Sequence, residues 1–282
     1  MKIAFNTWVY SSFPVWVPSY PLQDTIERIA AIGYDGIEIG AASPHAFPDY
    51  LDAKARKNIR RMLEQNRLSL AAMLPAPGGG PGFNSASPLA AERAATVEQY
   101  KKVVDLCSDL GGRTVIYVAG WQVFGTTRDE AWSRSREALT AIAEAARAKG
   151  VTIVIEPTSA DSNLVDSADD AIRMMKEAGA PNVKLMFDTY HAIYRNEVSS
   201  DYVHRMGRDL HHVHLADAGR AAPSDSGRAD YRALITALAA QGYEGYLSME
   251  IGFDRRAVEP DRIARDAYNY IKPLVDAASG KK

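Results

Sequence analysis

Residues 151–191 read VTIVIEPTSADSNLVDSADDAIRMMKEAGAPNVKLMFDTYH. The stretch begins and ends with short apolar and β-branched runs, 151–156 and 183–188, and each run finishes on a carboxylate, Glu156 and Asp188. The two carboxylates are 32 residues apart, about the length of one strand-plus-helix unit. The stretch therefore predicts two parallel strands joined by a helix, with both carboxylates at the same edge of the sheet.

The same pattern extends in both directions along the chain. His214 in LHHVHLAD and Glu250 in YLSMEI follow at spacings of 26 and 36 residues, again at the ends of strand-like runs. Eight such runs are present, at 3–8, 36–40, 68–74, 114–120, 151–156, 183–188, 210–215 and 246–251. Segments with helical periodicity lie between them, for example 21–33, 129–150 and 230–242, and each of these closes on a glycine, as helices often do.

This alternation predicts an α/β fold, a (β/α)₈ TIM barrel, as a single domain over residues 1–282. A doubly wound open sheet is the alternative, but it would usually carry a glycine fingerprint after the first strand, and NTWVYSSFPVW (6–16) has no glycine. The glycine-rich stretch 75–87 follows the third strand, where a mobile lid over a substrate is one interpretation and a plain connection the other.

Composition narrows the function classes. The chain is 46% hydrophobic and 24% charged, as in ordinary globular proteins, and its net charge of −2 gives no basic field for nucleic acid or a membrane surface. The first residues lack a signal-peptide pattern and no apolar run approaches membrane-spanning length, so we expect a cytoplasmic protein. Cys107 is the sole cysteine and reads as buried packing.

The four polar residues at strand ends predict a metal site. The C-terminal ends of strands in a parallel barrel surround one cavity, so Glu156, Asp188, His214 and Glu250 should meet there. Three oxygen donors and one imidazole favour Mn²⁺, with Mg²⁺, Co²⁺ or Zn²⁺ as alternatives. His211 and His212 compete with His214, but strand alternation puts only His212 on the same face, and His214 is nearer the strand's end.

These residues also suggest a reaction. A cation with open positions can be chelated by a hydroxy-ketone, which makes the intervening C–H acidic because the enediolate is stabilised. Glu156 and Glu250, on the fifth and eighth strands, face each other across the ring and form the candidate acid/base pair. Reprotonation of the same carbon is epimerisation, and reprotonation of its neighbour is aldose–ketose isomerisation; the sequence leaves both open.

At these positions the chain resembles the xylose isomerase-like TIM barrel superfamily, a sugar isomerase/epimerase group that includes tagatose/allulose 3-epimerases and fructoselysine 3-epimerase. The resemblance covers nearly the whole chain. The motifs that carry it are GYDGIEI (33–39), PHAF (44–47), IEP (155–157), FDTYH (187–191), HVHLAD (212–217) and GYEGYLSMEI (242–251).

The resemblance implies that Glu156, Asp188, His214 and Glu250 bind the divalent ion, with Glu156 and Glu250 doubling as acid and base. It implies substrate contacts for His191, for Arg220 and, through PHAF, for His45. The aromatic residues after strands one and four, Trp8, Tyr10, Trp16 and Trp121, either pack internally or line the mouth, and Trp121 is the candidate substrate contact among them. Relatives imply a homo-oligomer.

Two departures from the family pattern leave the substrate open. Many 3-epimerases carry a second glutamate six residues after the first ligand, where this chain has Ser162, with Asp161 as a replacement if the loop is one residue shorter. The usual Pro-Gly-x-Gly after strand seven is replaced by PSDSG (223–227).

Other functions remain as alternatives. The same enediolate can expel a leaving group, as in inosose dehydratase-like or 3-keto-glycoside-cleaving relatives, which work with a partner subunit in some cases. An apurinic-site endonuclease would need further histidines and a basic groove, and a non-catalytic sugar-binding barrel would be expected to have lost one of the two glutamates. The prediction is therefore an enzyme acting on a small sugar.

Overall fold

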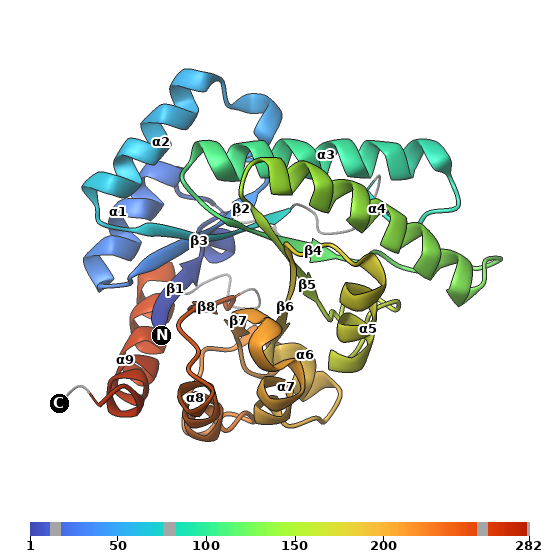
Figure 1. Cartoon of the computed structure of the whole chain (residues 1–282). Helices are drawn as coiled ribbons and strands as arrows, with labels where there is room; N and C mark the ends of the chain where they lie inside the picture. Colours follow the sequence, from blue (N-terminus) through green and yellow to red (C-terminus); the bar gives the residue numbers. More distant parts are fainter. Residues whose placement is uncertain (12–17, 76–82, 253–258, 281–282) are drawn as a thin grey trace.

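The computed structural model describes residues 1–11, 18–75, 83–252 and 259–280. Its strands form a closed parallel barrel in which each strand pairs with the next along the chain and the last pairs with the first, which confirms the predicted TIM barrel (Figure 1). The strands are β1 Lys2–Asn6, β2 Gly36–Ala41, β3 Ser69–Pro75, β4 Thr114–Val118, β5 Thr152–Glu156, β6 Val183–Asp188, β7 Leu210–Leu215 and β8 Tyr246–Met249.

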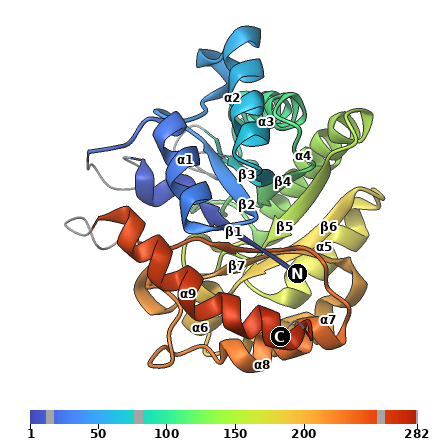
Figure 2. The same cartoon turned by 90° about the vertical axis from the view of Figure 1, so that its left-hand side faces the viewer.

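Helices surround the barrel. They are α1 Leu22–Ile32, α2 Ala53–Gln65, α3 Ala90–Asp109, α4 Arg128–Ala148, α5 Ala168–Ala178, α6 Thr189–Tyr194, α7 Ser199–Met206, α8 Tyr231–Ala240 and α9 Pro260–Ala278, with 3₁₀ turns η1 Thr7–Tyr10, η2 Pro48–Tyr50, η3 Gly207–Asp209 and η4 Ala218–Arg220. Helix α9 contacts both α1 and α8, so the last helix closes the ring beside the first (Figure 2). No helix in the described part of the chain is both long and apolar enough to cross a membrane.

Local chemistry sets the ends of the elements. The first strand stops at Asn6, two residues earlier than predicted, because the Asn6 side chain accepts a hydrogen bond from the Trp8 amide at 2.8 Å and starts η1. Helix α4 begins with a capping box. The Thr127 side chain accepts a hydrogen bond from the Glu130 backbone amide, and the Glu130 side chain accepts one from the Thr127 backbone amide. The predicted glycine at the end of α1 is its C-cap, since Gly33 takes a left-handed φ of 111°.

The apolar core has two parts. One lies between the strands and the helices and includes Ile153, Phe187 and Leu247, and Cys107 is buried there in α3 as expected. The other fills the barrel with Trp8, Ala42, Ala72, Leu74, Ile116, Val154 and Met186. The Trp8 ring lies so close to Gly40 that a Cβ there would come within 2.4 Å of it, so β2 needs a glycine at this position.

Candidate metal centre

Strand alternation brings the four predicted ligands to one place. Glu156 and Asp188 stand two residues beyond Val154 and Met186, which fill the barrel, so their side chains also point inward. Asp188 pairs with His214 in the β6–β7 register, and Glu250 follows β8 by one residue.

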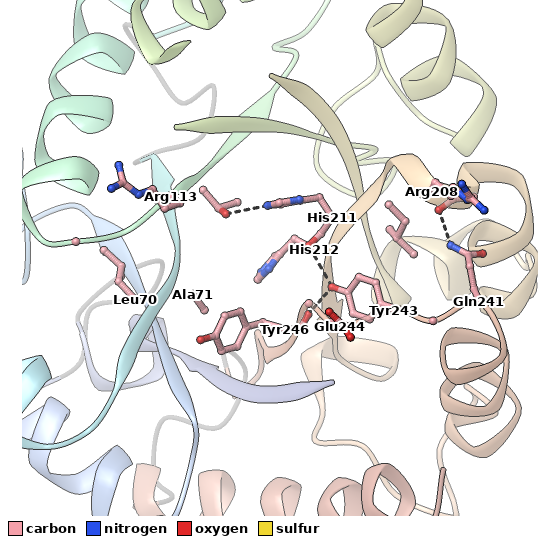
Figure 3. A pocket seen from close by; sticks show the side chains of 16 residues that line it. Leu70, Ala71, Arg113, Arg208, His211, His212, Gln241, Tyr243, Glu244 and Tyr246 are labelled. Atoms are coloured by element: carbon pink, nitrogen blue, oxygen red, sulfur yellow. Dashed lines mark hydrogen bonds between the residues drawn. The ribbon is translucent and has the colours of Figure 1, made fainter. Parts of the chain in front are cut away.

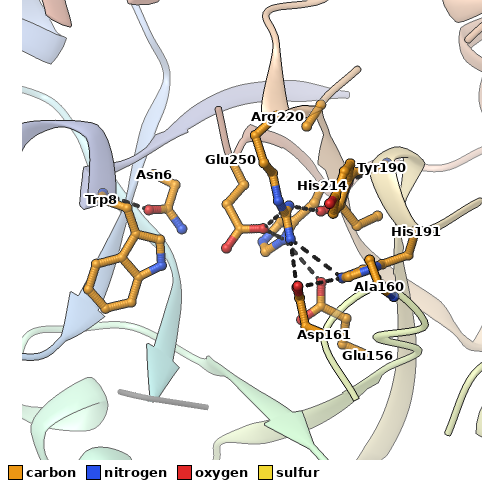
Figure 4. A network of polar contacts seen from close by, with 12 residues as sticks. Asn6, Trp8, Glu156, Ala160, Asp161, Tyr190, His191, His214, Arg220 and Glu250 are labelled. Atoms are coloured by element: carbon orange, nitrogen blue, oxygen red, sulfur yellow. Dashed lines mark hydrogen bonds and ion pairs between the residues drawn. The ribbon is translucent and has the colours of Figure 1, made fainter. Parts of the chain in front are cut away.

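The ligand atoms of these residues are close enough to hold one cation. One atom from each of the four, Glu156, Asp188, His214 and Glu250, lies within 4.8 Å of all the others, and all four side chains are buried. Figure 4 labels three of them, Glu156, His214 and Glu250. Nδ1 of His214 is 3.4 Å from Oε1 of Glu156 and 3.3 Å from Oε2 of Glu250.

Two atoms of this cluster lack hydrogen bonds. In the described part of the chain, Nδ1 of His214 and Oε1 of Glu156 are buried without a hydrogen-bond partner. Burying such atoms without a hydrogen-bond partner costs free energy of folding. Both an imidazole nitrogen and a carboxylate oxygen can coordinate divalent cations. With two further carboxylates beside them, the residues fit a divalent ion with oxygen and nitrogen ligands.

Arg220 lies in the same cluster. It is buried, and its guanidinium donates to Asp188 and to Glu250. The guanidinium also stacks over the Tyr190 ring, 4.3 Å from its centroid, and reaches Asp161 at 3.3 Å. Of the two residues considered as a replacement for the family's second glutamate, Asp161 is the one whose carboxylate reaches the site.

An unusual turn places Arg220. Both Gly219 and Arg220 adopt left-handed φ angles, 67° and 58°, in η4 directly after β7. The Arg220 carbonyl accepts the Gly252 amide at 2.8 Å, and Asp217 fixes the loop by accepting from the Arg228 amide at 2.9 Å. A non-glycine residue in this conformation is strained, and such strain is often found at functional sites.

His191 lies beside the guanidinium. It is buried in α6, and its Nδ1 accepts a hydrogen bond from the Ala160 amide at 3.2 Å. Its Nε2 is 3.5 Å from Arg220 and from Asp161. Burial, followed by the charge of Arg220, lowers the pKa of His191 well below its usual value. The ring is therefore neutral, and its Nε2–H points into the site (Figure 4).

The carboxylates differ in acidity. Burial raises the pKa of Glu156 and raises that of Asp188 to about 7, in the latter case against the charge of Arg220. Burial acts in the same direction on Glu250, but Arg220 and His214 outweigh it and lower the pKa of Glu250 to about 2. Glu250 is thus the ionised member of the pair, and Glu156 the one that takes up a proton more readily.

The other predicted contact residues, His45 and Trp121, have hydrogen bonds to groups outside the cluster. Nε2 of His45 is bonded to the Tyr20 carbonyl at 2.9 Å, and Trp121 is held through its backbone by Asn84 at 2.9 and 3.0 Å. Within the described residues, neither side chain hydrogen-bonds to a predicted ligand. Trp8 and Tyr10 are buried rather than exposed at a mouth. Trp16 and most of the candidate lid 75–87, namely 76–82, lie outside the described residues.

The sequence alone did not assign Glu38 a role. It lies within β2 and is fully buried, and it hydrogen-bonds to His212 and His214 across the barrel. Strand alternation correctly placed His212 and His214 on one face and exposed His211 on the other. The only available signal for Glu38 was a charged residue in the middle of an otherwise apolar strand.

One cavity borders the site, and another lies at the opposite end of the barrel. One of about 450 Å³ has Arg220 in its wall and is otherwise lined by the loops after β7 and β8 and by α9, including Ser224, Ser226 and Arg262. The other, of about 760 Å³, is at the opposite end of the barrel, where Thr114, Leu210 and Tyr246 begin their strands (Figure 3). The larger cavity is therefore remote from the ligand cluster.

Comparisons with known proteins agree with this architecture. The sequence profile of the xylose isomerase-like TIM barrel family matches residues 26–274. The chain is 25% identical over 260 residues to the fructoselysine 3-epimerase of Shigella flexneri, covering 90% of this chain and 94% of that protein. It is 32% identical over 255 residues to the L-ribulose 3-epimerase of Mesorhizobium japonicum, covering 88% and 80%. A solved structure of an L-ribulose 3-epimerase has the same fold, with a TM-score of 0.84 at 24% identity over 99% of this chain and 96% of that one.

Proposed function

Because the chain belongs to the xylose isomerase-like TIM barrel family, we propose that it is a divalent-metal-dependent epimerase or isomerase of a ketose or keto-sugar derivative. The observation that carries this proposal is the buried cluster in which Glu156 and Glu250 both lie within 3.4 Å of His214 Nδ1. Relatives named as fructoselysine and ribulose 3-epimerases support the substrate class.

Glu156, Asp188, His214 and Glu250 would hold the ion, and Mn²⁺ is the cation that we expect. When bound, a divalent cation polarises the carbonyl and hydroxyl of a hydroxy-ketone and acidifies the C–H between them. The pair of carboxylates supplies the proton transfer, which contributes roughly 10²- to 10⁴-fold to such reactions.

The acidities of the two glutamates suggest their roles. Glu250, held ionised by Arg220, removes the proton next to the carbonyl, and Glu156, with its raised pKa, delivers a proton to the opposite face of that carbon. In the reverse direction the roles exchange. Each turnover leaves Glu250 protonated and Glu156 ionised. Proton exchange with water then restores the starting state of both carboxylates.

The remaining site residues orient the substrate. His191 offers Nε2–H as a donor, and Arg220 offers a guanidinium, so both are suited to sugar oxygens. His45 and Trp121 complete the proposed substrate contacts at the mouth. The 450 Å³ cavity beside Arg220 has room for a substituent on the sugar, which favours keto-sugar derivatives in addition to free ketoses.

Product analysis tests the proposal. Mn²⁺-loaded protein is incubated with ketoses, fructoselysine and 3-keto-glucosides, with and without EDTA, and products are identified by chromatography and mass spectrometry. We expect an isomer of unchanged mass that forms only in the presence of metal. Metal-dependent loss of water or of an aglycone would instead identify a lyase, and turnover that persists in EDTA would overturn the metal-dependent reaction.

A further inference from the structure

Glu38 occupies the barrel interior beside the proposed metal centre. Its Oε1 accepts from Asn6 Nδ2 at 2.5 Å, and its Oε2 contacts Nε2 of His212 at 2.7 Å. Nε2 of His214 lies 2.9 Å from Oε1 and 3.0 Å from Oε2. Three side chains from β1 and β7 therefore converge on one carboxylate of β2.

The contacts of Glu38 make its carboxylate an acceptor. Asn6 Nδ2, which can only donate, bonds to Oε1, and Nε2 of His212 and Nε2 of His214 lie within 3.0 Å of Oε2. A carboxylate that accepts at both oxygens requires N–H from each imidazole that faces it. A cation that displaces one proton from His214 therefore leaves the remaining hydrogen on Nε2 and the lone pair on Nδ1.

That lone pair points at the proposed cation position. Nδ1 is on the edge of the ring that faces Glu156 and Glu250, and among the described residues it has no hydrogen-bond partner. The opposite tautomer would put N–H where a ligand is needed and would leave Nε2 facing a carboxylate with no hydrogen between them. Carboxylates that fix a metal-binding histidine in this way commonly change metal affinity by 10- to 100-fold when removed.

We propose that Glu38 is a positioning residue of the metal centre, which holds His214 in the tautomer and orientation that present Nδ1 to the cation. His212 supports Glu38 by donating to Oε2, and its ring stands 5.2 Å from that of His214 at 80°. His212 also lines the cavity at the far end of the barrel (Figure 3), so it lies between that cavity and Glu38 in the chain of contacts.

Glu38, His212 and His214 could also be regarded as a second cation site, since their donor atoms lie within 4.8 Å of one another. Both imidazoles turn Nε2 toward Glu38 at hydrogen-bonding distances, however, and Asn6 already donates to the same carboxylate. A cation there would have to displace these hydrogens. The proposal therefore expects one tightly bound Mn²⁺ per chain.

Mn²⁺ titration followed by electron paramagnetic resonance tests the proposal in Glu38→Gln. The amide keeps the shape of the side chain but loses the charge that demands N–H from His214. We expect one Mn²⁺ per wild-type chain and a dissociation constant about 10- to 100-fold higher in the variant. Raising the Mn²⁺ concentration should restore most of the variant's activity, because Glu38 does not contact the substrate in the proposed mechanism.

Glu244→Gln is the matched control. Glu244 is exposed at the far end of the barrel, so the same chemical change there should leave Mn²⁺ affinity unaltered. Equal affinity in wild type, Glu38→Gln and Glu244→Gln would overturn the proposal, and so would two tight Mn²⁺ ions per wild-type chain.

Long-range ¹H–¹⁵N correlation of Zn²⁺-loaded wild-type protein reads the tautomer directly and does not depend on whether the variant folds. We expect hydrogen on Nε2 of His214, and hydrogen on Nδ1 would contradict the inference. The inference rests on the proposed metal centre but not on the substrate. Failure of wild type to bind Mn²⁺ would remove the metal centre itself, whereas absence of sugar turnover with Mn²⁺ bound would remove only the proposed reaction.

Discussion

Glu156 and Glu250 have identical side chains but opposite surroundings. Arg220 and His214 hold Glu250 ionised, while burial raises the pKa of Glu156. One substitution at each position therefore tests the acid/base assignment. Glu156→Gln and Glu250→Gln should each lower turnover by about 10²- to 10⁴-fold, measured with saturating Mn²⁺, with circular dichroism unchanged.

The control for those substitutions is again Glu244→Gln, which should retain full turnover because Glu244 lies at the far end of the barrel. Near-wild-type activity in either active-site variant would contradict the two-carboxylate mechanism.

Arg220 neutralises the buried carboxylates of Asp188 and Glu250. Its removal should therefore lower the free energy of unfolding most when no cation is bound. Arg220→Met leaves Asp188 and Glu250 without their buried partner, and we expect the metal-free protein to lose about 3 kcal/mol of unfolding free energy. Mn²⁺ should recover part of this loss. Denaturant unfolding with and without Mn²⁺ measures both values, and exposed Arg60 provides the comparison variant Arg60→Met. A loss as small as that of Arg60→Met would contradict this role.

The acidity of Asp188 predicts a pH dependence. Protons and the cation compete for the same oxygens, and burial raises the pKa of Asp188 to about 7 and also raises that of Glu156. Mn²⁺ affinity should therefore fall as the pH drops through about 7. The fall should begin at higher pH, because the charges of Glu38 and Glu250 outweigh burial and raise the pKa of His214 well above its usual value. Ordinary carboxyl groups, with pKa values of roughly 4, would give constant affinity over that range. Calorimetric titrations between about pH 5.5 and 8.5 decide between the two.

At the scale of elements, the strands were the most predictable part. β6 and β7 have the predicted limits. β6 ends on Asp188, and β7 ends on Leu215, one residue after His214. β1 ended early because Asn6 caps a turn, which depends on one hydrogen bond rather than on a pattern. The role of Glu38 could not be predicted, because its contact with β7 depends on how the closed barrel aligns distant strands.

We expect the left-handed glycine of the η4 turn to matter for activity as well as for stability. Gly219 has φ 67° immediately before Arg220. Gly179 has φ 64° at the end of α5, before β6 begins, and so lies at the opposite end of that strand from Asp188. Alanine at either position should cost about 1–2 kcal/mol, because left-handed backbone disfavours a Cβ. Only Gly219→Ala should also reduce kcat/KM, since it displaces Arg220. Steady-state kinetics of the two variants check this, and equal kcat/KM values would contradict it.

At the scale of the whole molecule, the ligands come from four successive strands, β5 to β8, or the residue directly after one, so the cation joins half of the barrel. A cation that binds only the folded chain stabilises it by about 2.7 kcal/mol at a hundredfold excess over its Kd. Thermal melts should therefore shift upward with Mn²⁺ and back with EDTA. Asp188→Asn should shift much less, and an equal shift in that variant would indicate that Mn²⁺ binds elsewhere.

Deuterium exchange into a converted substrate tests the proposed metal-dependent proton transfer most directly. Mn²⁺-loaded protein is incubated in D₂O with L-ribulose, D-fructose or fructoselysine, and the sugar is then examined by ¹H NMR, alongside metal-stripped protein. We expect deuterium at the carbon next to the carbonyl, only with metal, and a product whose mass differs from that of the substrate only by the added deuterium. Conversion without deuterium incorporation, or incorporation that survives removal of the metal, would contradict it.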